Sequence, residues 1–295
     1  MVLSTRVRGT WPVIAGVLVL AACGSGESAG DDGAPRPLVA TTTIWADVTS
    51  HVACGEHVDS IVPAGTDPHQ FEPSLRDRER LTKAGAVIAN GAGLEQSLAD
   101  LVDTAAGDGV PVVAIAEHVD IVDGDPHIWQ DPRRVLAAID VIEPAVVAAG
   151  RDAAKIAACA DEYRSELTTL DHEIETTLAA VPPERRMLVT NHDAFEYFAS
   201  RYGFEIIGAV IPSSSTLGEG SAGQLADLAD AIEAHHVPAI FAERLGSTHD
   251  AEALADRLGV EVVELDSDAL ESDGPASSYT GMMRANADAI AAALS

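Results

Sequence analysis

The tripeptide Asp-Pro-His occurs twice in this sequence, in "DPHQFEPS" at 67–74 and in "DPHIWQDP" at 125–132, although the chain has only 10 histidines in 295 residues. Proline restricts the backbone, and an Asp side chain accepts hydrogen bonds from nearby backbone groups. Each Asp-Pro pair is therefore expected to stiffen a turn and to present its imidazole from a rigid backbone. A neutral imidazole is a common ligand of transition-metal ions. The two turns predict two metal ligands, His69 and His127.

A third histidine and an aspartate complete a set of ligands. His192 follows the strand-like run "RMLVT", and Asp266 follows the run "VEVVEL". Side chains just beyond the ends of parallel strands face the ligand crevice of an α/β sheet. Three imidazoles and one carboxylate make a tetrahedral set for a divalent ion such as Zn²⁺. Because the four residues lie far apart in sequence, they predict a site assembled between two halves of the chain.

Two further carboxylates compete with this assignment. Asp268 lies two residues beyond Asp266 and is the alternative fourth ligand. Glu243 ends the strand-like run "PAIFAE" at 238–243. It is an alternative ligand, or a residue that anchors a ligand histidine without touching the ion.

The pattern of apolar runs predicts an α/β fold. Short β-branched runs alternate with helical stretches in each half of the chain, which favours parallel sheets because parallel strands need crossover connections. We expect two parallel-sheet α/β lobes joined by one long backbone helix, with the metal site in the cleft between the lobes. The expected strands are 38–44, 58–63, 86–90 and 110–115 in the first lobe, and 186–190, 204–210, 238–243 and 260–265 in the second.

The middle of the chain predicts the joining helix. From 152 to 181 no Gly or Pro interrupts the sequence, and Pro182 and Pro183 end it. Apolar residues recur at spacings of three and four, which describes one apolar stripe along a single helix. The stripe consists of Ile156, Ala160, Tyr163, Leu167, Leu170, Ile174, Leu178 and Val181. The predicted divisions are an N-terminal lobe at 38–150, the linking helix at 151–182 and a C-terminal lobe at 183–295.

The N-terminus predicts export. Arg6 and Arg8 precede an apolar run of 13 residues, Trp11 to Cys23, which is shorter than the roughly 20 residues that span a bilayer. The run fits a signal peptide at 1–23. Its end, "LAAC", resembles the bacterial lipobox, so Cys23 is the expected lipidation site. The alternative is an ordinary signal peptide. Residues 24–37 read as a flexible tether, which places the protein on the outer face of the cytoplasmic membrane.

The net charge argues against nucleic-acid binding, and the number of cysteines bears on a possible disulfide. The formal net charge is −29, from 47 acidic and 18 basic residues, and such a chain is repelled by nucleic-acid phosphates. If Cys23 carries lipid, Cys54 and Cys159 remain as an even number of cysteines in an oxidising compartment. They are candidates for a disulfide, and the alternative is that each is a small buried apolar residue.

Four stretches together carry a family resemblance: "VPAGTDPHQFEPS", "DPHIWQDP", "TNHDAFEYFASRYGF" and "SYTGMMRANADAI". They resemble the zinc- and manganese-binding lipoproteins of bacterial ABC importers, the cluster A-I family that includes zinc-uptake and TroA-like solute-binding proteins. The resemblance covers about residues 38–294. It implies two lobes on a long backbone helix and one metal ion held by His69, His127, His192 and Asp266.

The resemblance also bears on the ion. The third position is commonly His in zinc members of the family and Glu in manganese members, and it is His192 here. A nitrogen-rich site suits Zn²⁺, whereas oxygen ligands serve Mn²⁺ better. The sequence departs from the family in two places. The stretch at 117–126 lacks the His-rich tract of many zinc members, and "LDSDAL" replaces the usual Leu-Asp-Pro around the fourth ligand.

These observations predict a binding protein rather than an enzyme. The leading hypothesis is a monomeric, lipid-anchored protein that binds Zn²⁺ outside the cytoplasm and delivers it to an ABC permease and its ATPase. The first alternative is the same role for Mn²⁺. A zinc hydrolase, with Glu243 as general base, is a remote alternative, because neither His-Glu-x-x-His nor a serine nucleophile elbow occurs. An adhesin is a further alternative that the sequence does not address.

Overall fold

The computed structural model describes Met1 and residues 35–245 and 248–295. The predicted signal peptide, Cys23 and most of the tether therefore lie outside the described residues. Pro35–Ser295 forms one compact unit. Within the described part of the chain, no helix has the length and apolar character needed to cross a membrane.

Two four-stranded parallel sheets form the framework. The first has the strand order β2-β1-β3-β4 and the second has the order β6-β5-β7-β8. The strands of the first sheet are β1 Leu38–Ala40, β2 Asp59–Ser60, β3 Ala86–Ala89 and β4 Val112–Ala114. Those of the second are β5 Met187–His192, β6 Glu205–Ile211, β7 Ala239–Glu243 and β8 Glu261–Leu265. Two parallel-sheet α/β lobes are thus present, as the sequence predicted.

Helices cover both faces of each sheet. The α-helices are α1 Thr43–Val52, α2 Leu75–Lys83, α3 Ala99–Gly107, α4 Pro132–Ala148, α5 Ala153–Leu178, α6 Glu196–Tyr202, α7 Ala222–His235, α8 His249–Leu258 and α9 Tyr279–Leu294. Short 3₁₀ turns lie at η1 Gln96–Leu98, η2 Ile115–Glu117, η3 Ile128–Gln130, η4 Pro183–Arg185 and η5 Pro275–Ser277.

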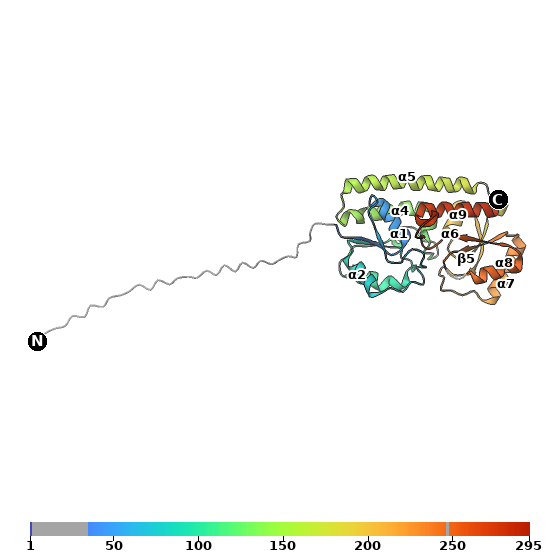
Figure 1. The fold of residues 1–295 in the computed structure, drawn as a ribbon, viewed down its shortest axis with the longest axis horizontal. Helices are drawn as coiled ribbons and strands as arrows, with labels where there is room; N and C mark the ends of the chain where they lie inside the picture. The colour runs from blue at the N-terminus through green and yellow to red at the C-terminus, as the bar shows by residue number, and fades with distance from the viewer. Residues whose placement is uncertain (2–34, 246–247) are drawn as a thin grey trace. The chain divides into compact units, whose positions relative to one another are not determined.

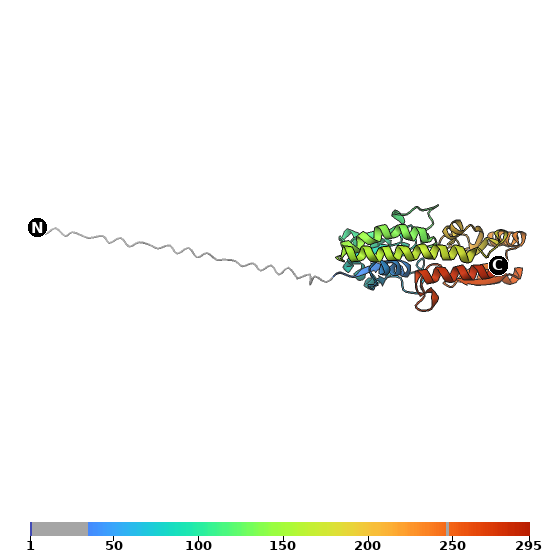
Figure 2. The ribbon, with the colours of Figure 1, turned by 90° about the horizontal axis from the view of Figure 1, so that it is seen from above.

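Helix α5 spans both lobes. It begins after Asp152, whose side chain caps the helix by accepting a hydrogen bond from the Lys155 backbone. Its 26 residues give a length of roughly 39 Å. Figures 1 and 2 show α5 running over both sheets, with α4 and α9 beside and beneath it. The predicted apolar stripe is buried at every position, including Val181 just beyond the helix.

The alternation of side chains along the strands sorts the core into layers. In β1, Leu38 and Ala40 join the apolar cluster that faces α5, while Val39 faces α2 and α3 on the other side. Successive residues of a strand point to opposite faces, which explains this division. The cluster under α5 continues without a break into the second lobe, to Leu188 and Phe241. The two lobes therefore share one hydrophobic core along α5.

The first predicted strand is shorter than expected. Thr43 and Ile44, assigned to that strand from sequence, instead begin α1. The reason is a helix cap: the Thr42 side chain accepts a hydrogen bond from the Trp45 backbone N–H, and a capping threonine starts a helix at the next residue. The run of β-branched residues concealed this signal.

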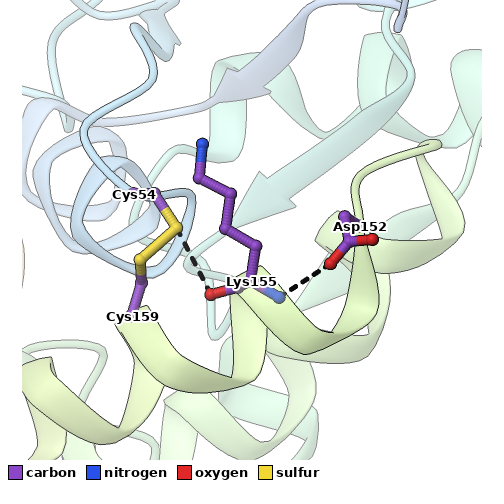
Figure 3. The surroundings of a disulfide bond; sticks show 4 residues. All are labelled: Cys54, Asp152, Lys155 and Cys159. Atoms are coloured by element: carbon purple, nitrogen blue, oxygen red, sulfur yellow. Dashed lines mark hydrogen bonds between the residues drawn. A yellow bond between two sulfur atoms is a disulfide. The ribbon is translucent and has the colours of Figure 1, made fainter.

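Cys54 and Cys159 form a disulfide. Their Cα atoms lie 5.4 Å apart and the bond closes a separation of 105 residues, within the range that a disulfide spans. Figure 3 shows the bond joining the end of α1 to the first half of α5, with Cys54 Sγ 3.5 Å from the Lys155 carbonyl oxygen. The first lobe is thereby attached covalently to the helix that runs along both lobes.

We predict that removing this disulfide lowers the free energy of unfolding by about 2–4 kcal/mol, because the bond restricts the unfolded chain over a long loop. The measurement is chemical denaturation of the protein with and without reductant. The matched control is the double variant Cys54→Ser/Cys159→Ser, in which the reductant should change nothing. An unchanged denaturation midpoint in the reduced natural chain would contradict the prediction.

Candidate metal centre

Four buried side chains from both lobes meet at one point. His69 lies in the loop between β2 and α2, and His127 lies directly before η3. His192 is the last residue of β5, and Asp268 lies in the loop after β8. The three imidazoles and the carboxylate each offer one ligand atom within 4.8 Å of the others. His127 and His192 are fully buried.

The distances within the group match a tetrahedral ion. His127 Nε2 lies 3.4 Å from His69 Nε2 and 3.3 Å from His192 Nε2. The Asp268 carboxylate oxygens lie 3.7, 3.7 and 3.5 Å from Nε2 of His69, His127 and His192. A tetrahedral zinc ion with bonds of about 2.05 Å separates its ligand atoms by about 3.3–3.4 Å. The imidazole distances to His127 equal this value and the Asp268 distances are slightly longer, so the group has about the size of a four-coordinate site.

Both Asp-Pro-His turns use the same local hydrogen bond. Asp67 Oδ1 accepts from the His69 backbone N–H at 2.8 Å, and Asp125 Oδ1 accepts from the His127 backbone N–H at 2.9 Å. This side-chain-to-backbone bond closes each turn around the proline. The turns are stiff for the reason expected from the sequence.

Two of the imidazoles are also oriented through their other ring nitrogen. Asp125 Oδ1 lies 2.6 Å from His127 Nδ1, and Glu243 contacts His192 Nδ1. A partner that accepts the Nδ1 proton leaves the Nε2 lone pair free for a metal ion. Of the two roles considered for Glu243, the structure supports the one that anchors a histidine.

The structure does not bring Asp266, the expected fourth ligand, to this group. Its Oδ1 accepts a hydrogen bond from Arg244 Nε at 3.1 Å. Its backbone N–H and carbonyl are both bound by the Asn286 side chain, at 3.0 and 2.6 Å. The loop therefore directs the first aspartate to an arginine, and the second, Asp268, to the histidines. Two aspartates two residues apart carry no sequence signal that separates these roles.

The Asp268 loop is held from both lobes. Trp129 Nε1, in η3 of the first lobe, donates to the Ser267 carbonyl at 2.7 Å. Tyr279 OH donates to the Trp129 carbonyl, also at 2.7 Å. The loop that carries Asp268 is thus tied to the turn that follows His127. Ligands from opposite lobes share one rigid support.

Burial and charge set the pKa values of the three histidines apart. Burial lowers the pKa of His69 and lowers that of His127 well below its usual range. Burial also opposes the charging of His192, but the Asp268 and Glu243 carboxylates outweigh it and raise the pKa of His192 to about 9. Burial raises the pKa of Asp125 to about 6. In the absence of a cation, the group therefore holds one proton at neutral pH, on His192.

Comparison with known proteins places the chain in a family. Residues 38–293 match the family described as zinc-uptake complex component A, periplasmic. The chain belongs to this family. The resemblance noted in the sequence is thereby confirmed, and the family groups the chain with binding components rather than with enzymes.

Individual relatives cover nearly the whole chain. It is 32% identical to the manganese-binding lipoprotein MntA of Halalkalibacterium halodurans, over 94% of this chain and 95% of that protein. It is 29% identical to the manganese ABC transporter substrate-binding lipoprotein PsaA of Streptococcus mitis, over 94% and 95%. The structure of the periplasmic zinc binding protein TroA of Treponema pallidum superposes with a TM-score of 0.83 at 29% identity, covering 89% of this chain and all of that one.

We predict that metal binding releases about one proton per ion at pH 7.5, because the proton on His192 must leave before its Nε2 can coordinate. The apparent affinity should then rise about tenfold per pH unit between pH 7 and 8.5, below the raised pKa of His192. His69 and His127 are already neutral there and add nothing to the slope. Calorimetric titration in buffers of different ionisation enthalpy measures the protons released. An affinity that is independent of pH over this range would contradict the prediction.

Proposed function

We propose that this chain is the extracytoplasmic solute-binding component of an ABC importer and that its cargo is Zn²⁺. The observation that carries the proposal is the buried group of three imidazole Nε2 atoms and one carboxylate at tetrahedral spacing. Its ligands are His69, His127, His192 and Asp268. Imidazole nitrogen with a single carboxylate is a donor set that favours Zn²⁺ over Mn²⁺.

Mn²⁺ is the second candidate cargo, because MntA and PsaA are named for manganese. Competition of Zn²⁺ and Mn²⁺ against a chelating indicator decides between them. The proposal expects one ion per chain and tighter binding of Zn²⁺. Tighter binding of Mn²⁺ would overturn the choice of cargo and leave the transport role standing.

The geometry disfavours the hydrolase alternative. A catalytic zinc keeps one coordination position open for water and needs a nearby general base. Here Asp268 stands at the fourth position, and the Glu243 carboxylate is engaged by His192 at both its ring and its backbone N–H. Glu243 therefore serves to orient His192 and is not free to act as a base.

The proposed location and partners follow from the family and the N-terminal sequence. Lipidation at Cys23 anchors the chain to the outer face of the cytoplasmic membrane, with 24–37 as the tether. A monomer then presents its cleft to the permease, whose ATPase drives uptake. The names of MntA and PsaA as lipoproteins support this assignment.

We further propose that release of the ion involves local loop movement rather than wide opening of a hinge. The lobes share a continuous core beneath α5, and Trp129 ties the first lobe to the Asp268 loop. On the β6–α7 loop, Thr216 Oγ1 donates to Asp67 Oδ2 at 2.6 Å. This bond joins the lobes beside His69 through two polar groups that can bond to water instead, so the contact can open without exposing the apolar core.

We predict that Asp268→Ala lowers zinc affinity by at least about 100-fold, because it removes a direct ligand. The matched control is Asp266→Ala, two residues away, which breaks only a pair with the half-exposed Arg244 and should change affinity by less than about threefold. Competitive titration of both variants gives the comparison. The reverse ranking would restore Asp266 as the ligand.

A further inference from the structure

One turn supports both metal-binding histidines of the first lobe. The β3–η1 turn, residues 90–95, follows strand β3 and precedes η1. The Leu94 backbone lies near the His69 ring and acts to raise its pKa, against the larger lowering by burial. His69 Nε2 itself faces His127 and Asp268. The β3–η1 turn is therefore a neighbour of the His69 imidazole.

The same turn holds the backbone next to His127. Asn90 Nδ2 donates to the Pro126 carbonyl at 2.9 Å, one residue before His127. Trp45 Nε1 donates to Asn90 Oδ1 at 2.7 Å, which fixes the direction of the Asn90 amide. Two loops that are distant in sequence thus contact one support. The separation of their two imidazoles depends on the shape of the β3–η1 turn.

A buried carboxylate closes this turn. Glu95 Oε1 accepts from the Asn90 backbone N–H at 2.8 Å and from Thr41 Oγ1 at 2.7 Å. Glu95 is only 5% exposed, and no cation is paired with it among the described residues. The bond to Asn90 joins the two ends of the turn, and the bond to Thr41 ties the turn to the end of β1. Burial raises the pKa of Glu95, and the hydrogen bonds from Thr41 and Asn90 oppose that shift.

The backbone of the turn needs such a closure. Gly91, Ala92 and Gly93 all have positive φ angles, of 81°, 52° and 81°. The left-handed region suits glycine but is unfavourable for alanine. A strained conformation persists only when surrounding contacts hold it in place. The Glu95 hydrogen bonds span the strained residues and supply these contacts.

We propose that Glu95 is a positioning residue that makes the site selective for a tetrahedral ion by fixing the separation of His69 Nε2 and His127 Nε2. The inference rests on the proposed function. The separation of 3.4 Å equals the edge of a tetrahedral zinc site, about 3.3–3.4 Å. An octahedral ion with bonds of about 2.2 Å, between those of Mg²⁺ and Ca²⁺, needs adjacent ligands about 3.1 Å apart. If the two Nε2 atoms are held at this separation, the site favours Zn²⁺. If they are free to move closer together, the site can also suit Mn²⁺.

The test compares zinc and manganese affinities of the Glu95→Ala variant by competitive titration. Zinc affinity should fall about 10–100-fold while manganese affinity falls less, so that the ratio of the two drops at least about tenfold. Glu95→Gln keeps an oxygen that can accept from Asn90 and Thr41, and it should retain most of the ratio. Bound Co²⁺ reports the geometry: its intense tetrahedral absorption should weaken in Glu95→Ala and persist in Glu95→Gln.

Control variants separate positioning from general stability. Leu254→Ala, on the buried face of α8, destabilises the fold away from the site and should leave the ratio unchanged. If Glu95→Ala does not fold, Thr41→Val removes one of the two bonds and should lower the ratio about fivefold. Equal losses of zinc and manganese affinity in Glu95→Ala, or a natural ratio of the two affinities in Glu95→Ala or Thr41→Val, would overturn the inference. Failure of the natural chain to bind zinc would instead overturn the proposed function.

Discussion

The convergence of three imidazole nitrogens and one carboxylate on a single buried point is the constraint on which the rest of the structure depends. Nε2 atoms 3.3 and 3.4 Å apart cannot satisfy one another when each presents a lone pair. Water is excluded, because His127 and His192 are fully buried. A cation at the centre satisfies all four groups at once. Without the cation, the proton on His192 allows its Nε2 to donate to His127 Nε2 at 3.3 Å, and the fold must hold the remaining groups close together.

The fold supplies that support through a second set of contacts. The Asp125 and Glu243 carboxylates each engage one imidazole from behind. These partners come from loops and strand ends that rest on the core shared along α5. The disulfide at Cys54 adds a covalent attachment of the first lobe to the same helix. The positions of the ligands are therefore set by elements from the whole described chain, and this explains why the site needs two lobes on one rigid helix.

Much of this architecture could be predicted from the spacing of apolar residues and from local turn chemistry. The apolar stripe of α5 was predictable because burial of one helix face leaves apolar residues at spacings of three and four. The three histidines were predictable because they stand where strands end or where Asp-Pro stiffens a turn. The carboxylate that joins them was not, since the positions of Asp266 and Asp268 depend on contacts with Arg244 and Asn286. Contacts of this kind join residues about 20 positions apart and leave no local pattern. The supporting role of the β3–η1 turn could not be predicted either, because its contacts also join residues distant in sequence.

The central claim is that one ion is held by His69, His127, His192 and Asp268. Its most direct test is a crystal structure of the zinc-loaded protein, with anomalous scattering measured on both sides of the zinc edge. The account predicts one anomalous peak, with three Nε2 atoms and one Asp268 oxygen at about 2.0–2.2 Å from it. A peak coordinated by Asp266, or a zinc ion with only three protein ligands and a bound water, would contradict the account.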